Sequence, residues 1–228
     1  MADIEKKLFS QALDDDLTAW KCMQNKRDNL MFDNANEIIK SIFSITSQNI
    51  INYQPVDFLP DETDKSLFLG THVNVFNYNY FEKQFNNLFK RIKLLNCPIN
   101  LALVMIDNLE EIAQTYEMPV CVSLISAVSE LLQKKLTEPQ FASLCVFGYF
   151  AVVLPEQTLA ESVLEFEKFR NEISDHTFSI NNKNYTITTS VGIANYPNHA
   201  KSQDELKLAS IQALQHAINK GGDRLTVY

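Results

Sequence analysis

The chain has 228 residues, of which 46% are hydrophobic and 11% aromatic, so it can build a packed core and is not disordered throughout. Its formal charge is −8 and its basic residues are dispersed, which argues against a nucleic-acid-binding protein. The longest apolar runs, 101–106 and 150–155, are far too short to cross a bilayer. Residues 1–16 mix acids with lysines and lack the apolar core of a secretory signal, so we expect a cytoplasmic protein without a membrane span.

The four cysteines and four histidines are scattered along the sequence. No two cysteines form a C-x-x-C pair and no histidine lies at ligand spacing, so the sequence predicts no metal site. No histidine has the serine, cysteine and acid context that would indicate a catalytic triad. From these residue types we therefore expect no catalytic residue, no metal and no cofactor.

Residues 1–53 predict a helical arm, because apolar side chains recur there at helical spacing. Residues 54–69 contain Pro55 and Pro60 among acids and lysines, a composition typical of a linker. A regular pattern of helices and strands begins after this linker, so we expect a single domain at 70–228.

The domain begins with an amphipathic helix at 79–95, followed by a near-continuous apolar strand at 99–106 of the kind that is buried on both faces. The elements expected after this strand are helices at 108–116 and 119–136, strands at 143–147 and 150–154, a helix at 157–174, strands at 177–180 and 184–194, a helix at 203–219 and a strand at 224–228. This order predicts an α+β sandwich in which helices flank a mostly antiparallel central sheet, with the N-terminal helical arm as an extension.

Two tight turns are expected within this pattern. Gly148 lies between two short apolar strands, where a glycine allows the chain to reverse. Asn181, Asn182 and Lys183 separate a second pair of strands and are a strong hairpin signal. Both segments are therefore predicted to be β-hairpins.

The C-terminal stretch 186-TITTSVGIANYPNHAKSQDELKLASIQALQHAINKGGDRLTVY-228 carries small and polar residues at characteristic intervals. A strand of the form T-x-S-x-G-x-A is followed by a Tyr-Pro loop, a helix with alanines on one side, and a glycine and an arginine before the last strand. The residues concerned are Thr188, Ser190, Gly192, Ala194, Tyr196, Pro197, Ala209, Ala213, Leu214, Ala217, Gly221 and Arg224. This stretch resembles the end of a GGDEF domain, the catalytic module of bacterial diguanylate cyclases.

The resemblance extends upstream and covers about 160 residues in all. Residues 70–81 are similar to the D-x-L-T-G-L-x-N-R-R-x-F segment of the family and keep Asn77 and Phe81. Residues 104–117 are similar to its D-x-D-x-F-K-x-I-N-D-x-Y-G segment, and residues 150–155 to the strand after its signature. The resemblance implies a GGDEF sandwich of the nucleotidyl-cyclase-like type.

Diguanylate cyclases condense two GTP molecules with the help of metal ions, which requires carboxylates for the cations and glycines where the backbone approaches phosphate. The resemblance places the G-G-D/E-E-F signature on Val146, Phe147, Gly148, Tyr149 and Phe150. Both phosphate-facing glycines are replaced by larger residues, and neither acid remains. The phenylalanine that packs in the strand, Phe150, matches the family.

The other functional positions of the family are also replaced. The resemblance places the metal-binding aspartate on Met105, the two guanine-reading residues on Ala113 and Val122, the phosphate-contacting lysine on Ile218 and an arginine on Gly222. Asp107 matches a second aspartate, which mainly serves structure. The inhibitory R-x-x-D site falls on Thr137 and Gln140, so we expect no cyclic di-GMP there. A metal–triphosphate complex among apolar side chains would be buried without partners for its charge, so cyclase activity is not expected.

Two further groups resemble sites but have simpler explanations. Residues 221–223 spell G-G-D, but they lie between the last helix and the last strand, where we expect a helix cap and a turn. Asp107, Glu110 and Glu111 lie on one turn, but the hairpin has no partner acid, so a solvated helix start is expected.

We therefore expect a catalytically inactive GGDEF-like domain that acts as a protein-interaction, scaffold or regulatory module in bacterial signalling. Its partners would be proteins, with homodimerisation through residues 1–53 as one arrangement. The candidate surface at the former active site consists of Met105, Val122, Val146, Phe147, Tyr149 and Ile218. The alternative is a receptor that binds a nucleotide or another small ligand in the remodelled cleft without turnover.

Overall fold

The computed structural model describes residues 75–115, 118–146 and 148–228. The chain divides into two compact units, Met1–Leu67 and Phe68–Tyr228, and every described residue belongs to the second. The predicted helical arm at 1–53 and the linker at 54–69 lie outside the described residues and stay predictions.

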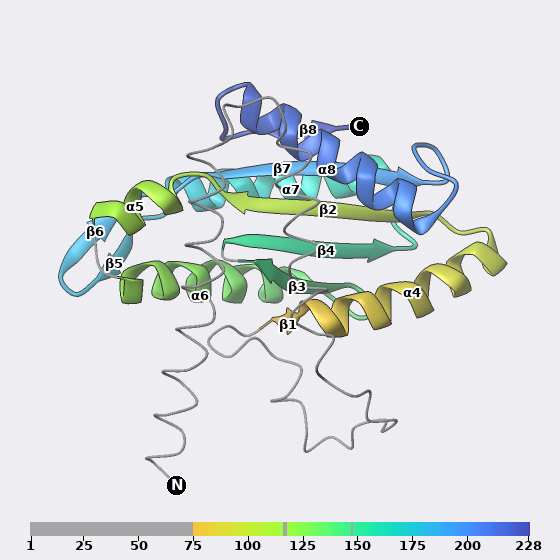
Figure 1. Cartoon of the computed structure of the whole chain (residues 1–228), viewed down its shortest axis with the longest axis horizontal. Helices are drawn as coiled ribbons and strands as arrows, with labels where there is room; N and C mark the ends of the chain where they lie inside the picture. The colour runs from red at the N-terminus through yellow and green to blue at the C-terminus, as the bar shows by residue number, and fades with distance from the viewer. Residues whose placement is uncertain (1–74, 116–117, 147) are drawn as a thin grey trace, which may run out of the picture. The chain divides into compact units, whose positions relative to one another are not determined.

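A six-stranded sheet forms the centre of the described unit (Figure 1). Its strands lie in the order β1-β3-β4-β2-β7-β8, so neighbours in the sheet are often distant in the sequence. The three inner pairings are antiparallel, whereas each edge strand runs parallel to its neighbour. The strands are β1 (Phe76–Asn77), β2 (Ile99–Ile106), β3 (Phe141–Val146), β4 (Tyr149–Pro155), β7 (Thr189–Tyr196) and β8 (Leu225–Val227). The prediction of a mostly antiparallel sheet is confirmed.

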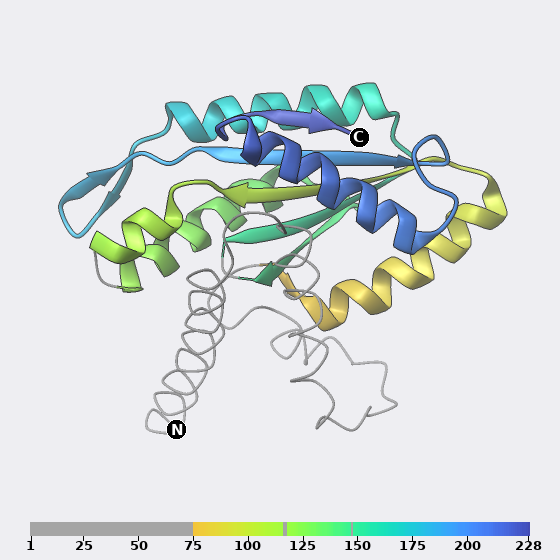
Figure 2. The same ribbon diagram turned by 45° about the horizontal axis from the view of Figure 1, so that its top comes forward.

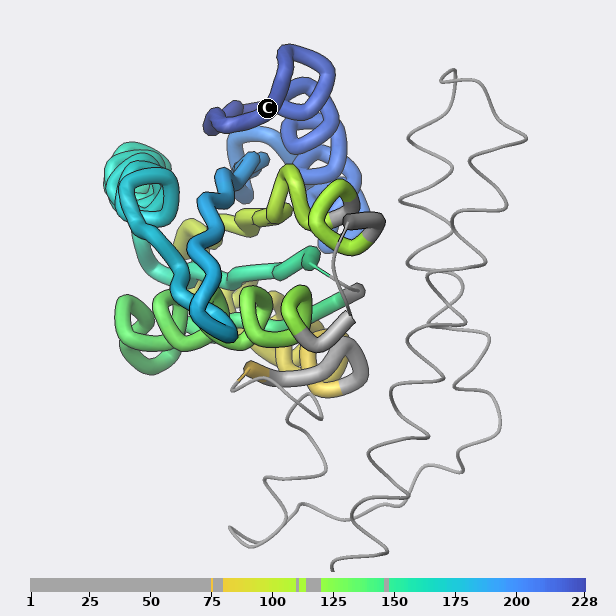
Figure 3. The backbone as a smooth tube through the Cα atoms, turned by 90° about the vertical axis from the view of Figure 1, so that its left-hand side faces the viewer, coloured from red at the N-terminus to blue at the C-terminus, as the bar shows by residue number. Residues whose placement is uncertain are grey.

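Helices cover both faces of this sheet. One face carries α4 and α8, and the other carries α6 and α7 (Figures 1 and 2). The end-on view of Figure 3 places α7 and α8 on opposite sides of the strands. The helices are α4 (Tyr78–Leu95), α5 (Leu109–Thr115), α6 (Met118–Lys135), α7 (Leu159–Asp175) and α8 (Gln203–Asn219). The predicted α+β sandwich is therefore confirmed.

Strand β2 is the central element, because it is paired along both edges and covered on both faces. Leu103 lies opposite Ala151 of β4 and Gly192 of β7. All eight residues of β2 are buried, which explains why the sequence there is apolar without alternation. Its side chains alternate between two core layers, one under α6 and α7 and the other under α4 and α8.

The layer under α4 is largely aromatic. Phe81 and Phe85 stack with ring centroids 5.2 Å apart, and Phe89 meets Tyr196 of β7 edge to face at 5.0 Å. These rings recur along one side of α4, so the amphipathic pattern of the sequence becomes the contact between helix and sheet.

The second hairpin differs from its prediction. Instead of one strand at 184–194, the chain forms β6 (Lys183–Tyr185) and then β7, and β6 pairs with β5 (Phe178–Ile180) in a separate two-stranded sheet. The turn itself is as expected, since Asn181 and Asn182 both have positive φ, 51° and 62°. Side chains that follow β2 form hydrogen bonds with residues 186–188, where the strand is interrupted. Asn108 Nδ2, for example, donates to the Thr186 carbonyl at 2.9 Å.

Helix α8 lies unusually close to β7 at Gly192. A Cβ atom at this position would lie 2.1 Å from the backbone nitrogen of Leu214, a distance at which the helix backbone itself would have to move. The buried alanines of α8, Ala209, Ala213 and Ala217, allow the same close approach along the helix. Small residues on both elements are therefore required by packing.

We expect Gly192→Ala to lower the free energy of unfolding by about 3 kcal/mol or more, because the added methyl group collides with backbone rather than with a mobile side chain. Urea denaturation measures this change. The matched control is Gly221→Ala, where φ is +102° but no atom lies within 4 Å of the new Cβ, so backbone strain alone should cost about 1–2 kcal/mol. A smaller loss for Gly192→Ala than for Gly221→Ala would contradict the packing argument.

Candidate functional site

The candidate surface lies at the end of the sheet where β2 ends and the β3–β4 hairpin turns (Figure 1). The strand register places Met105 of β2 opposite Tyr149 of β4, and Tyr149 opposite Val146 of β3. Three of the six predicted positions therefore form one row across adjacent strands.

The other members of the candidate surface come from different places. Val122 lies in α6 and Ile218 near the end of α8, so these two residues belong to helices on opposite faces of the sheet. Met105 is only 9% exposed and packs in the core, whereas Val122, Tyr149 and Ile218 are half-buried and keep some accessible area. Phe147 and the side chain of Val146 lie outside the described residues.

Gly148 is fixed against the end of β2. Its φ is +76°, and its carbonyl accepts a hydrogen bond from the backbone N–H of Ile106 at 3.0 Å. A Cβ atom here would lie 2.6 Å from Cδ2 of the buried Leu109. The glycine therefore serves the geometry of this hairpin turn.

The carboxylate of Asp107 is fully engaged by protein donors. Thr188 Oγ1 donates to its Oδ2 at 2.8 Å, and Ser190 Oγ donates to its Oδ1 at 2.5 Å. The backbone N–H of Asp223 also donates to Oδ2, at 3.0 Å. Both carboxylate oxygens thus bind β7 and the turn before β8, which is a structural role.

The glycines at 221–222 end helix α8 and position that turn. The N–H of Gly221 bonds the Ile218 carbonyl at 2.9 Å, and the N–H of Gly222 bonds the Ala217 carbonyl at 3.2 Å, the pattern of a Schellman cap. Gly222 has φ +73°, and a Cβ there would lie only 3.1–3.3 Å from the Asp107 carboxyl group. The G-G-D sequence is therefore a helix end packed around Asp107.

Across the part of the chain that the structure describes, no group of three or more histidine, cysteine, aspartate or glutamate side chains is arranged to hold a metal ion. The three described cysteines, Cys97, Cys121 and Cys145, are not paired in disulfides. Burial raises the pKa of Cys145 to about 12 and that of Cys121 to about 11, so both thiols stay protonated near neutral pH.

We expect Asp107→Ala to lower the free energy of unfolding by about 1–3 kcal/mol, because the buried hydroxyl of Ser190 would lose its acceptor. Thermal unfolding with and without Mg²⁺ distinguishes this role from metal binding, since the wild-type midpoint should be the same in both. The exposed Asp204 of α8 supplies the control, because Asp204→Ala should change the free energy of unfolding little. A wild-type midpoint that rises with Mg²⁺, and no longer does so in Asp107→Ala, would contradict the structural role.

A polar cluster under α7 had no counterpart among the residues predicted from sequence. Asn100 of β2 donates from Nδ2 to Ser162 Oγ at 2.7 Å and to the Gln157 carbonyl at 2.9 Å, and it accepts from Asn195 Nδ2 at 2.6 Å. All three side chains, of Asn100, Ser162 and Asn195, are almost completely buried. The signal available in the sequence was an asparagine inside an otherwise apolar strand. The cluster joins β2, β7 and the start of α7.

His199 lies beside this cluster and is sensitive to pH. Its Nδ1 accepts a hydrogen bond from the backbone N–H of Asn195 at 3.2 Å, and its ring packs near Tyr228 at 5.8 Å. Burial lowers the pKa of His199 below its usual value of 6.5, because the charged form is desolvated. Protonation would also remove the acceptor at Nδ1.

The stabilisation from neutral His199 is complete above pH 6.5 and is lost as the pH falls through the lowered folded-state pKa. We therefore expect the free energy of unfolding to decline below pH 6.5, and His199→Gln to make that decline shallower. Urea denaturation over a pH series measures it. His216→Gln, at an exposed position in α8, should leave the decline as it is in the wild type. Equal slopes for His199→Gln and the wild type would exclude this histidine as the cause.

A family model described as "Diguanylate cyclase, GGDEF domain" matches residues 71–224. The chain belongs to the GGDEF domain family. This is a family of bacterial cyclic di-GMP signalling, and its members are normally diguanylate cyclases. No curated protein sequence matches the chain significantly.

Solved GGDEF structures share the fold at low sequence identity. The GGDEF domain of DgcB from Caulobacter crescentus, in complex with c-di-GMP, is 20% identical with a TM-score of 0.67, over 75% of this chain and 98% of that one. The active GGEEF domain of a diguanylate cyclase from Vibrio cholerae is 21% identical with a TM-score of 0.62, over 67% of this chain and 96% of that one. Diguanylate cyclase SiaD from Pseudomonas aeruginosa, in complex with its activator SiaC, is 13% identical with a TM-score of 0.67, over 100% of this chain and 82% of that one.

Two further observations concern membrane-spanning helices and the residues Thr137 and Gln140. Among the helices within the described ranges, none combines the length and apolarity needed to cross a membrane. Thr137 and Gln140, where the resemblance puts an inhibitory site, are joined by a hydrogen bond: Gln140 Oε1 accepts from the Thr137 N–H at 3.1 Å. Gln140 Nε2 also donates to Gln157 Oε1 at 3.3 Å. Neutral groups bonded to one another thus occupy these two positions.

Proposed function

We propose that this GGDEF domain is catalytically inactive and acts in the cytoplasm as a protein-interaction, scaffold or regulatory module of cyclic di-GMP signalling. The observation that carries the proposal is the row of Met105, Tyr149 and Val146, which lies where the sequence resemblance puts acids and a glycine of the family. Cyclase chemistry needs carboxylates for the metal ions, and this row offers none.

The hydrogen bonds of the Asp107 carboxylate also support the proposal that the domain is inactive. Its two oxygens already accept three hydrogen bonds, which leaves little of the carboxylate for a cation. The neighbouring Met105 is buried and apolar, and charge placed beside it without partners is strongly unfavourable. We therefore propose that the domain keeps the GGDEF fold but lacks the ligands for a catalytic cation.

We propose that the domain binds other proteins. The relative SiaD is in complex with its activator SiaC, which is an example of a diguanylate cyclase bound to another protein. For this chain we propose protein partners, with a homodimer through residues 1–53 as one arrangement, and no nucleic acid. We also propose that no cyclic di-GMP binds at Thr137 and Gln140, because neither residue carries a charge and the Gln140 carboxamide is already bonded to the Thr137 N–H and to Gln157.

We expect the purified chain, incubated with GTP and Mg²⁺ or Mn²⁺, to form no cyclic di-GMP by mass spectrometry, while an active GGDEF domain assayed beside it forms the product. We also expect no heat of binding when GTP or cyclic di-GMP is titrated into it.

Affinity capture from the native cell, followed by reconstitution with the purified partner, tests the interaction. Product formation would overturn the inactive assignment. A stable monomer that captures no partner would overturn the scaffold role. Measurable binding of GTP or cyclic di-GMP in the titration would favour the receptor alternative.

A further inference from the structure

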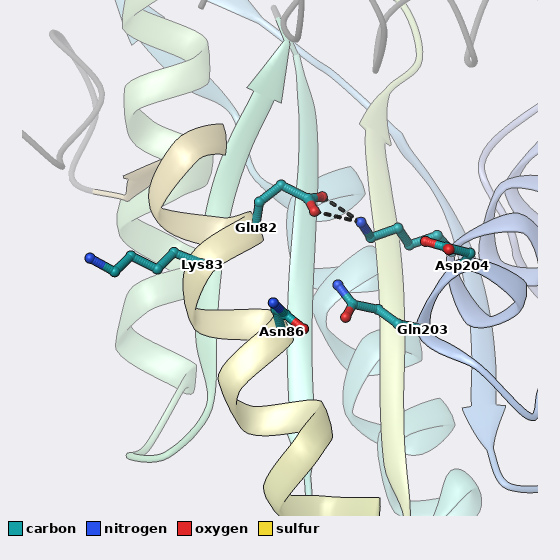
Figure 4. A pocket seen from close by; sticks show the side chains of 6 residues that line it. Glu82, Lys83, Asn86, Gln203 and Asp204 are labelled. Carbon is teal, nitrogen blue, oxygen red and sulfur yellow. Dashed lines mark hydrogen bonds and ion pairs between the residues drawn. The ribbon is translucent and has the colours of Figure 1, made fainter. Parts of the chain in front are cut away.

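An open groove of about 510 Å³ lies between α4 and α8, and neither Met105 nor Tyr149 lines it. Figure 4 shows its lining side chains, which come from both helices. They are Glu82, Lys83 and Asn86 of α4 and Gln203, Asp204 and Lys207 of α8.

An ion pair fixes the distance between the two walls of this groove. Lys207 Nζ contacts both carboxylate oxygens of Glu82, at 2.6 and 2.7 Å, and the two side chains are 17% and 35% exposed. The Lys207 ammonium also lies 5.9 Å from the centre of the Phe85 ring. Because α4 and α8 are joined by this contact and rest on the same sheet, the groove exists before anything binds.

Two carboxamides face each other across the groove. Asn86 projects from α4 and Gln203 from α8, next to the ion pair (Figure 4). Neither side chain has a hydrogen-bond partner within the described part of the chain, and the same holds for Lys83 and Asp204. Each carboxamide offers two N–H donors and one oxygen acceptor, so the pair can bind a group that both donates and accepts.

The charges of the lining decide between kinds of occupant. Lys83 and Lys207 are balanced by Glu82 and Asp204, so the groove has no net attraction for a polyanion, and a nucleotide phosphate would meet two carboxylates. A purely apolar occupant would bury the two carboxamides without partners, which is unfavourable. An extended peptide carries no required charge, and its main chain presents alternating N–H and C=O groups.

We propose that this groove binds an extended peptide segment of a partner protein, held through its main chain by Asn86 and Gln203. The inference rests on the proposed role of the domain as an interaction module and names where the partner binds. Lys83 and Asp204, both exposed, then favour peptides that carry an acidic side chain beside α4 and a basic one beside α8.

The test selects binders from a displayed library of short linear peptides, using the full chain as the target. The enriched peptides are synthesised and titrated by fluorescence anisotropy. We expect the double variant Asn86→Ala/Gln203→Ala to bind them at least about tenfold more weakly, since two hydrogen bonds are lost. The matched control, Asn87→Ala/Gln212→Ala, removes the same groups from the same helices outside the groove and should bind like the wild type.

A second arm tests recognition of the main chain. N-methylation of the peptide's backbone amides, one at a time, should weaken binding about tenfold at one or more positions while leaving the side chains unchanged. The inference is overturned if no peptide is enriched, if the groove variant binds as tightly as its control, or if every N-methylated peptide binds as before.

These outcomes are separable from those of the proposed function. If a partner captured from the native cell binds the Asn86→Ala/Gln203→Ala variant as tightly as the wild type, the interaction role stands and the groove is excluded as its site. If peptides bind the groove but no cellular partner is captured, the groove stands and the scaffold role fails.

Discussion

The carboxylate of Asp107 is the contact on which the arrangement of the domain depends. It stands at the end of the buried central strand and accepts from Thr188, from Ser190 and from the N–H of Asp223. Asp223 in turn pairs with Arg170 of α7 at 2.7 Å. One charged group thus links β2, β7, the end of α8 and α7, and hydrogen bonds to an ionised acceptor are stronger than those between neutral groups.

This arrangement is compatible with the proposed loss of the catalytic residues. The close approach of Leu214 to Gly192, which holds α8 on the sheet, lies outside the positions where the resemblance puts metal and nucleotide binding. Phe150 remains buried in β4, and Gly148 still shapes the turn. On the proposed assignment, packing and catalysis depend on different residues, so one set can change while the other is kept.

Much of the fold could be predicted because its elements have strong periodicity. The continuous apolar run 99–106 became the central strand, and the amphipathic run near 79–95 became α4. The two-residue β1 is too short to leave a pattern in the sequence. The break between β6 and β7 could not be predicted either, because it depends on Asp107 and Asn108, which meet 186–188 only after folding.

The site was less predictable than the fold for a related reason. The resemblance to the GGDEF family implied that Met105, Tyr149 and Val122 belong to one region, but it did not assign each residue to a face of the sheet. The sheet register brings Met105 to Tyr149, whereas Val122 lies in a helix on the far side from α8. The α4–α8 groove was invisible in the sequence, because Asn86 and Gln203 look like ordinary surface amides until the helices are placed.

The order of strands in the sheet also has a consequence for synthesis of the chain. Strand β2 pairs with β4 on one edge and β7 on the other, so Ile99 meets Pro155 well before it can meet Tyr196. While the ribosome is still making the C-terminal part, the most apolar strand of the nascent chain has one edge without a partner. Such an edge favours association between neighbouring chains. The arrival of β7, with α8 packed over it, closes that edge, so an unfinished chain exposes an edge that the complete domain does not.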